Sequence, residues 1–305
     1  MKVLSIDGGG IRGIIPATVL CEIERRTGRP IAELFDLIAG TSTGGILACA
    51  LAKPGALSAD ELIALYEGEG PRIFDRSLLK RITSLQGWID ERYDDAGLDR
   101  ALRTFLGDSK LSEVRTPIFV TAYDIEGRFA FFFRSERAAA DPAYDFPLHA
   151  VARATSAAPT YFEPAAVTDL AGARTYPLID GGVYAVNPAM CAWADHPGEV
   201  ELLASLGTGG HTRPYSFEQA RGWGQIEWAR PLIDVVFDGI ADTIDFQLAQ
   251  VLPAGYLRFQ VELDEASDDL DDASPENLER LREAGRRLVR ENEAAIDDLC
   301  ARLTA

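Results

Sequence analysis

Basic residues are scarce in this 305-residue chain. Lysine and arginine together number 30 against 48 aspartates and glutamates, so the formal net charge is −18. A protein this acidic repels phosphate backbones and has no general attraction to anionic membranes. We therefore expect no binding to nucleic-acid backbones, and we expect any contact with a membrane to be local and transient.

Histidine and cysteine, the usual zinc ligands, are also few. The chain has three histidines and four cysteines, with no CxxC pair and no histidine at ligand spacing from a cysteine. This pattern disfavours both a zinc site and a disulfide framework. The sequence predicts reduced, mostly buried cysteines, and neither a metal nor another cofactor.

Long hydrophobic runs are absent as well. The longest, near residues 46–52, is far shorter than the roughly 18 residues that cross a bilayer. The apolar start at residues 3–6 is too short for a signal peptide and is followed at once by Asp7 and glycines. We expect a cytoplasmic protein, with peripheral membrane contact as an open alternative.

The hydrophobic residues that are present alternate between strand and helix patterns. Residues 3–6 predict a buried strand that leads through a glycine turn into a helix, and residues 35–52 repeat this plan. Further strands are predicted at residues 117–123, 128–134, 176–179, 200–206 and 256–263. The pattern predicts an α/β fold, a three-layer sandwich with a mainly parallel central sheet. No linker composition interrupts the chain, so we expect residues 1–305 to form a single domain.

The segment Gly40-Thr41-Ser42-Thr43-Gly44 matches the G-x-S-x-G pattern of a nucleophile elbow. Glycines allow a sharp turn between strand and helix, which exposes the serine hydroxyl at the helix N-terminus. That terminus supplies amide groups that favour developing negative charge. Because a buried-strand pattern precedes the turn and an apolar helix follows it, we predict that Ser42 is a nucleophile.

A second glycine turn, Asp7-Gly8-Gly9-Gly10-Ile11-Arg12-Gly13, has two interpretations. Its spacing fits the G-x-G-x-x-G fingerprint of dinucleotide-binding proteins. That site needs an acidic residue at the end of the second strand, whereas Asp36 stands at the beginning of that strand. We favour an oxyanion hole, in which the amides of Gly8, Gly9 and Gly10 bind a carbonyl oxygen as it gains negative charge.

A serine nucleophile needs a base. His149 falls in a predicted helix and His196 precedes Pro-Gly, while His211 follows a glycine turn and stays open as a candidate. Asp180 stands at the end of a short predicted strand, before Gly181 and Gly182. A carboxylate with a pKa near 4 is a poor base unless it is desolvated and hydrogen-bonded to the hydroxyl. We favour Asp180, although this segment alone would suggest an ordinary turn.

Together the three glycine segments resemble the motifs of the patatin-like phospholipases. D-G-G-G-x-R-G, G-T-S-T-G-G and D-G-G occur in this order, and residues 154–162 resemble the family's segment before its aspartate. The resemblance spans about residues 3–195; residues 196–305 are expected to complete the domain and to determine the substrate. It implies a patatin-like fold and a catalytic dyad of Ser42 and Asp180. The residues implied for the oxyanion hole are Gly8, Gly9, Gly10 and Arg12, and the other motif glycines are Gly13, Gly40, Gly44, Gly181 and Gly182.

The predicted activity is therefore hydrolysis of phospholipid or lysophospholipid esters, of the phospholipase A or lysophospholipase type. An acyl-Ser42 intermediate forms, and water activated by Asp180 releases the fatty acid. The alternative enzyme is an acyltransferase or thioesterase on the same dyad. A nucleotide-binding module that uses residues 8–13 is the alternative from another class. The oligomeric state is not predicted.

Three further segments lead to weaker predictions. Residues 72–88 interleave bases with large apolar side chains, which indicates either a surface helix or a lid that touches membranes. Trp223, Ile226 and Trp228 indicate either core packing or the border of an acyl pocket. The acidic residues 262–272 lack the ligand order of an EF-hand and predict a solvated loop.

Overall fold

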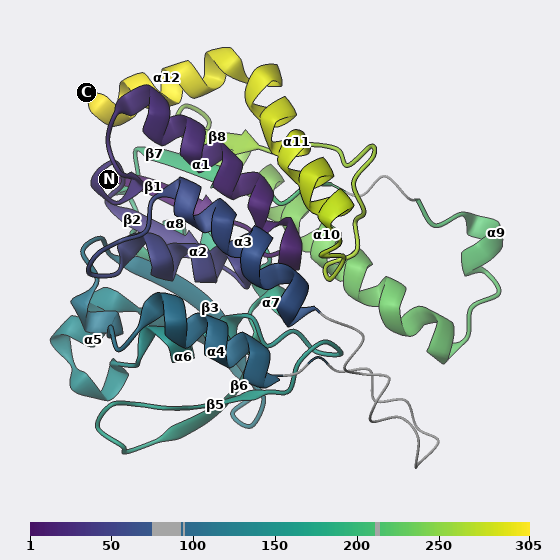
Figure 1. Cartoon of the computed structure of the whole chain (residues 1–305), viewed down its shortest axis with the longest axis horizontal. Coiled ribbons are helices and arrows are strands. Elements are labelled where there is room, and N and C mark those ends of the chain that lie inside the picture. The colour runs from purple at the N-terminus through teal and green to yellow at the C-terminus, as the bar shows by residue number, and fades with distance from the viewer. Residues whose placement is uncertain (75–92, 94, 211–213) are drawn as a thin grey trace.

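The computed structural model describes residues 1–74, 93, 95–210 and 214–305 (Figure 1). Its strands are β1 (Lys2–Ile6), β2 (Leu37–Gly40), β3 (Ile118–Asp124), β4 (Phe129–Arg134), β5 (Ala165–Thr168), β6 (Thr175–Asp180), β7 (Leu202–Leu206) and β8 (Tyr256–Phe259). Its helices are α1 (Ile14–Thr27), α2 (Thr43–Ala52), α3 (Ala59–Ile73), α4 (Asp95–Leu106), α5 (Ser135–Ala140), α6 (Leu148–Thr155), α7 (Gly182–Ala185), α8 (Ala189–Asp195), α9 (Phe217–Ala220), α10 (Gln225–Val251), α11 (Pro275–Glu291) and α12 (Glu293–Thr304). Most of the segment 72–88 and His211 lie outside the described residues.

The described strands form one sheet in the order β5-β6-β3-β2-β1-β7-β8, with β4 paired to β3. The pairs among β3, β2, β1, β7 and β8 are parallel, whereas β4, β5 and β6 join through antiparallel pairs. The predicted α/β class with a mostly parallel sheet is thus confirmed. Since β1 and β2 are parallel neighbours, the two glycine turns that follow them emerge at the same edge of the sheet.

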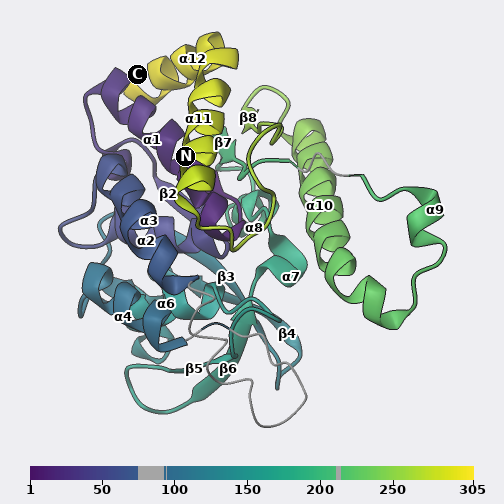
Figure 2. The ribbon, with the colours of Figure 1, turned by 45° about the vertical axis from the view of Figure 1, so that its right-hand side comes forward.

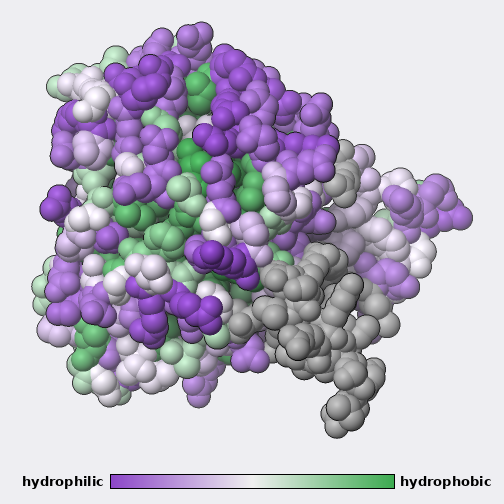
Figure 3. Space-filling view, viewed as in Figure 1, coloured by the Kyte–Doolittle hydropathy of each residue, from purple (hydrophilic) through white to green (hydrophobic). Residues whose placement is uncertain are grey.

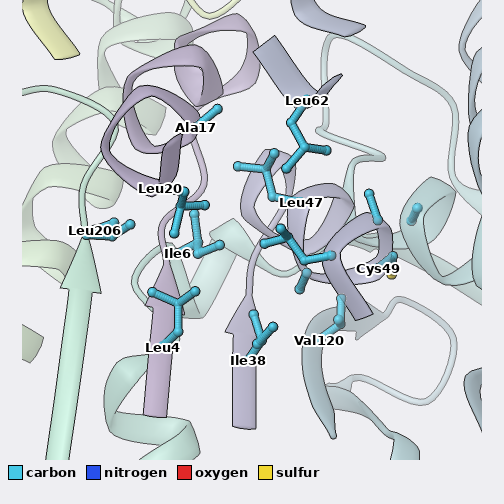
Figure 4. Close-up of a cluster of buried hydrophobic side chains, with 14 of the residues drawn as sticks. Leu4, Ile6, Ala17, Leu20, Ile38, Leu47, Cys49, Leu62, Val120 and Leu206 are labelled. Carbon is cyan, nitrogen blue, oxygen red and sulfur yellow. The ribbon is translucent and has the colours of Figure 1, made fainter. Parts of the chain in front are cut away.

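Helices cover both faces of this sheet because successive residues of its strands point to opposite sides. Leu4 and Ile6 of β1 pack with Leu20 of α1 and Leu47 of α2 (Figure 4). Val3, which directly precedes Leu4, belongs to a second buried cluster that includes residues of α8 and α10. The strand is therefore buried from both sides, as its nearly continuous apolar sequence requires.

The acidic residues 262–272 do not form the solvated loop that the sequence predicted. Leu263, Ala266 and Asp271 are buried, and the carbonyl oxygen of Leu270 accepts the Ile11 amide at 2.9 Å. Apolar residues spaced between the acids anchor the segment, while Glu262, Asp264, Glu265 and Asp269 are exposed. The loop therefore packs against the first glycine turn and belongs to the surroundings of the site.

Two helices project from the body of the molecule. Figure 2 shows α10 standing to one side of the sheet, with α9 farther out. On the face in Figure 3, hydrophilic side chains dominate over α11, α12 and α9, and hydrophobic ones gather nearer the middle. None of the described helices is both long and apolar enough to cross a membrane.

Candidate active site

Ser42 occupies a strained turn between β2 and α2. Its φ of 55° and ψ of −123° lie in a region that side-chain-bearing residues rarely adopt. A Cβ atom on Gly40 would overlap the Gly44 carbonyl, and one on Gly44 would overlap the Ile6 carbonyl. The Ser42 amide donates to Thr155 Oγ1 at 2.8 Å. The surroundings therefore hold the serine in the geometry of a nucleophile elbow.

The antiparallel strand β6 places Asp180 at the edge of the sheet where β2 ends and Ser42 follows. Gly40 at the end of β2 pairs with Val120 of β3, and Asp180 pairs with Ala122, two residues farther along β3. The Asp180 amide donates to the Ala157 carbonyl at 3.0 Å. The segment that contains Thr155 and Ala157 thus positions both the serine and the aspartate.

The Asp180 carboxyl group is buried and close to the serine hydroxyl. Its Oδ1 accepts the Gly182 amide at 2.7 Å. Burial raises the pKa of Asp180 to about 7, and hydrogen bonds from the Ser42 hydroxyl and the Gly182 amide oppose part of that rise. A carboxylate with a pKa near neutrality is a far better base than an exposed one.

The first glycine turn lies directly beside the elbow. A Cβ atom on Gly8 would stand 3.2 Å from Ser42 Cβ. However, the Gly8 amide donates to the Val186 carbonyl at 2.8 Å, and the Gly8 carbonyl accepts from Thr208 Oγ1 at 2.7 Å. Both polar backbone groups of Gly8 are therefore engaged in holding the turn.

Three neighbouring amides remain for a ligand. Within the described residues, the amides of Gly9, Gly10 and Thr43 have no hydrogen-bond acceptor. Gly10 has a φ of 58°, and a Cβ atom there would overlap the Leu270 carbonyl. Buried backbone amides are seldom left without an acceptor. Two amides of the glycine turn and one of the elbow are thus available for an anionic oxygen.

Arg12 stabilises the glycine turn through a hydrogen bond to its backbone. It is buried, and its Nε donates to the Gly9 carbonyl at 3.3 Å. Burial lowers the pKa of Arg12, and the acidic Asp268 and Asp238 oppose that shift. The side chain of Arg12 is not part of the cavity lining.

The Ser42 and Asp180 side chains border a mostly apolar cavity. It has about 850 Å³ of empty space, including its mouth. Its apolar walls come largely from α3 and α4, with contributions from α2 and from residues 156–162 after α6. Side chains that line it include Ile46, Leu65, Leu98, Leu102 and Phe105. Such a cavity suits a hydrocarbon chain attached to a group that reacts at Ser42.

Two wall residues lie beyond residues 3–195, the part of the chain that carries the resemblance. Phe237 of α10 and Leu270 of the acidic loop line the cavity. Trp223 and Trp228 do not line it: their rings contact each other with centroids 4.9 Å apart, and Trp228 is exposed. Both predictions, core packing and the border of an acyl pocket, are therefore wrong for Trp228. The side chain of Ile226 lies outside the described part of the structure.

The other candidates for polar roles lie elsewhere. His196 Nε2 is 3.7 Å from a Glu136 carboxylate oxygen, and burial and Arg103 lower the pKa of His149. Asp36 accepts the Lys2 amide at 2.6 Å, at the opposite end of β1 from the glycine turn, so it is not placed to bind a ribose there. The described part of the chain contains no group of three or more residues arranged to hold a metal ion.

Comparisons with known proteins extend the likeness beyond the glycine segments. The sequence profile described as "Patatin-like phospholipase" matches residues 4–193. "Patatin-like protein 2" of Arabidopsis thaliana is 34% identical, covering 97% of this chain and 84% of that protein. "Probable inactive patatin-3-Kuras 1" of Solanum tuberosum is 30% identical, covering 96% of this chain and 87% of that protein. Among solved structures, VipD from Legionella pneumophila matches with a TM-score of 0.41 at 10% identity, covering 95% of this chain and 67% of that chain.

Proposed function

This chain belongs to the patatin-like phospholipase family, and we propose that it is a lipid acyl hydrolase acting on phospholipids or lysophospholipids. One observation supports the proposal most strongly. A strained serine and a buried carboxylate with a raised pKa stand together at the wall of an apolar cavity. This combination suits attack on an ester whose acyl chain occupies the cavity.

The reaction proceeds in two halves. Asp180 accepts the hydroxyl proton as Ser42 Oγ bonds to the ester carbonyl carbon, and the carbonyl oxygen becomes an oxyanion. The tetrahedral intermediate expels the alcohol, which takes the proton from Asp180, and an acyl-serine remains. Asp180 then removes a proton from water as the water attacks the acyl-serine. The fatty acid leaves, and the proton returns to Ser42.

The oxyanion hole uses the amides of Gly9 and Gly10, with Thr43 as a third donor. Gly8, which the sequence analysis also included, contributes by its close packing against Ser42 rather than by its amide. Arg12 positions the turn through the Gly9 carbonyl. Amides fixed in this way need no reorganisation when negative charge develops.

The glycine turn favours hydrolysis over nucleotide binding. Cβ atoms on Gly9, Gly10 and Gly13 would overlap Thr208, Leu270 and Tyr66 in turn. The absence of side chains at these positions therefore serves packing within the protein rather than access for a phosphate. We also propose that the chain forms one domain, since β7 and β8 extend the same sheet beyond the profile match.

Covalent labelling tests the proposal. A fluorophosphonate should label the wild type and not the Ser42→Ala variant, and only the wild type should release fatty acid from lysophosphatidylcholine. Ser58→Ala is the matched control, because Ser58 also stands at the N-cap position of a helix but lies outside the cavity lining. Labelling that survives in Ser42→Ala would reject Ser42 as the nucleophile. Transfer of the acyl group to an added alcohol in preference to water would instead indicate an acyltransferase.

A further inference from the structure

Helix α10 is unusually exposed for its length. Its 27 residues extend over about 40 Å, yet Leu248 is the one buried side chain among those the structure describes on it. Figures 1 and 2 both show it along one side of the molecule, with α9 beyond it. A long helix with so little burial normally carries polar side chains all round.

The side chains of α10 do not follow that rule. Trp228, Leu232, Val235 and Phe246 are 37%, 53%, 46% and 67% exposed. At 3.6 residues per turn their positions fall within a sector of about 60°. These four residues are called the outer face of α10 below. It is an exposed apolar stripe in which Gly239 and Asp242 separate Val235 from Phe246, and Trp223 contacts its first member, Trp228.

The opposite side of the same helix reaches the catalytic cavity. Phe237 lines the cavity together with Ser42 and Asp180, and a Cβ atom on Gly182 would approach the Phe237 ring to 3.0 Å. The outer face is therefore separated from the cavity wall by the width of one helix, about 10 Å. Anything bound to the outer face lies next to the site.

We propose that the outer face of α10 docks on the surface of zwitterionic phospholipid aggregates. This inference rests on the proposed function, because acyl chains long enough to fill the cavity are presented to enzymes mainly in micelles and bilayers. Docking beside the cavity shortens the path of such a chain from the lipid to Ser42. The four apolar side chains supply the favourable contact with lipid.

Charge decides which surface fits. Asp238 and Asp242, both exposed, lie along one side of the outer face, and the whole chain carries −18. Anionic head groups would be repelled, whereas the quaternary ammonium of a phosphatidylcholine is compatible with neighbouring carboxylates. A second copy fits poorly, since in a two-fold antiparallel pair of α10 helices centred near residue 240 Asp238 of each copy would face Asp242 of the other.

Vesicle flotation tests the proposal without requiring turnover. In Ser42→Ala protein, the triple replacement Leu232→Ser, Val235→Ser and Phe246→Ser should weaken binding to phosphatidylcholine vesicles about tenfold or more. The matched control replaces three exposed apolar residues elsewhere, Ile125→Ser, Phe129→Ser and Leu170→Ser. The control should float like its parent, and with Ser42 intact both triple variants should hydrolyse a soluble short-chain ester at the parent rate.

Several results would overturn this assignment. Equal flotation of the two triple variants would remove the outer face as the docking site. A dimer in size-exclusion chromatography that becomes a monomer in the Leu232, Val235 and Phe246 variant, without vesicle binding, would show that the face joins two copies. Stronger binding of the parent to phosphatidylglycerol than to phosphatidylcholine at low salt would refute the charge argument.

The test of the docking surface can fail independently of the test of the proposed function. If Ser42 reacts with a fluorophosphonate but the protein does not float, the docking surface fails and the hydrolase stands. If the Ser42→Ala protein floats through α10 while the wild type releases no fatty acid, the hydrolase fails and the docking surface stands.

Discussion

Two Asp-Gly-Gly segments, at Asp7 and at Asp180, look alike in sequence and differ in the partners of their carboxyl groups. Each aspartate ends or directly follows a strand and is buried. Asp7 Oδ2 forms an ion pair with Arg258 Nη2 at 2.6 Å, and Arg258 also donates to Ser205. Asp180 has no cationic partner among the described residues; it faces the Ser42 hydroxyl and the Gly182 amide.

The difference shows that the Asp-Gly-Gly motif positions a carboxyl group, whereas the residues around that group determine its pKa and whether it can accept a proton. Burial raises the pKa of Asp7, and the Arg258 guanidinium opposes that rise. With an arginine held at its carboxylate, Asp7 stabilises the strand end and is not free to take a proton from substrate. Asp180 is buried without such compensation, so proton uptake near neutral pH is favourable for it.

The largest expected effect separates the two aspartates by activity. Asp180→Asn removes the proposed base and should lower kcat/KM for a soluble p-nitrophenyl ester at pH 8 by about a thousandfold. Asp7→Asn should lower it far less, because Asp7 touches neither Ser42 nor the cavity. Equal losses in the two folded variants, checked by circular dichroism, would mean that the Asp7 ion pair takes part in the chemistry.

The next effect separates them by stability. Arg258→Met leaves the buried Asp7 carboxylate without its cation and should lower the free energy of unfolding by about 3–5 kcal/mol. Adding Asp7→Asn to Arg258→Met should recover part of that loss, because the unpaired charge is gone. Urea unfolding measures both variants. A single variant as stable as the wild type would show that the ion pair contributes nothing net.

A smaller effect of opposite sign is expected at Asp180. The pKa of Asp180 is raised from 3.8 to about 7, so the folded state binds more protons than the unfolded chain between these values. The contribution of Asp180 to the free energy of unfolding of the wild type therefore falls as pH rises from 4 to 7 and stays low above 7. Asp180→Asn should be more stable than the wild type at pH 8, by about 2 kcal/mol, since each pKa unit corresponds to about 1.4 kcal/mol and some hydrogen bonding is lost.

Urea unfolding at pH 5 and pH 8 provides the measurement. The advantage of Asp180→Asn should shrink toward pH 5, whereas Asp7→Asn should be less stable than the wild type at both values. An Asp180→Asn protein that is less stable at pH 8 would contradict the view that the wild type keeps an unfavourable charge for its function.

The parallel part of the fold was predictable from local sequence. Strand patterns followed by glycine turns at Gly8 and Gly40 predict parallel neighbours, and parallel neighbours place both turns at one edge. The family resemblance had paired Ser42 with Asp180, but the local pattern could not say how they meet. Asp180 lies on an antiparallel strand. Its position along the sheet is therefore set by pairing with Ala122, not by the rule that parallel strands end at the same edge.

The residues that the C-terminal part of the chain adds to the site were not predictable, for a different reason. Phe237 belongs to a helix whose apolar residues occur on two faces, so hydrophobic periodicity alone cannot say which face lies toward the cavity. Leu270 lies in an acidic run whose average composition suggests solvent exposure, although single apolar residues anchor it. The acceptor of the Gly8 amide, Val186, is a backbone carbonyl distant in sequence, and side-chain patterns contain no signal for it.

The pH dependence of the rate is the mildest way to tell the two aspartates apart. With a pKa of about 7, Asp180 loses its capacity as a base as pH falls, so kcat/KM for a neutral soluble ester should drop tenfold per unit below pH 7. At pH 5.5 the wild type should therefore retain about one thirtieth of its plateau rate. Asp7→Asn should keep this inflection, whereas the residual activity of Asp180→Asn should lack it. An inflection near pH 7 that persists in Asp180→Asn and disappears in His211→Ala would assign the base to a histidine, because histidine also titrates in this range.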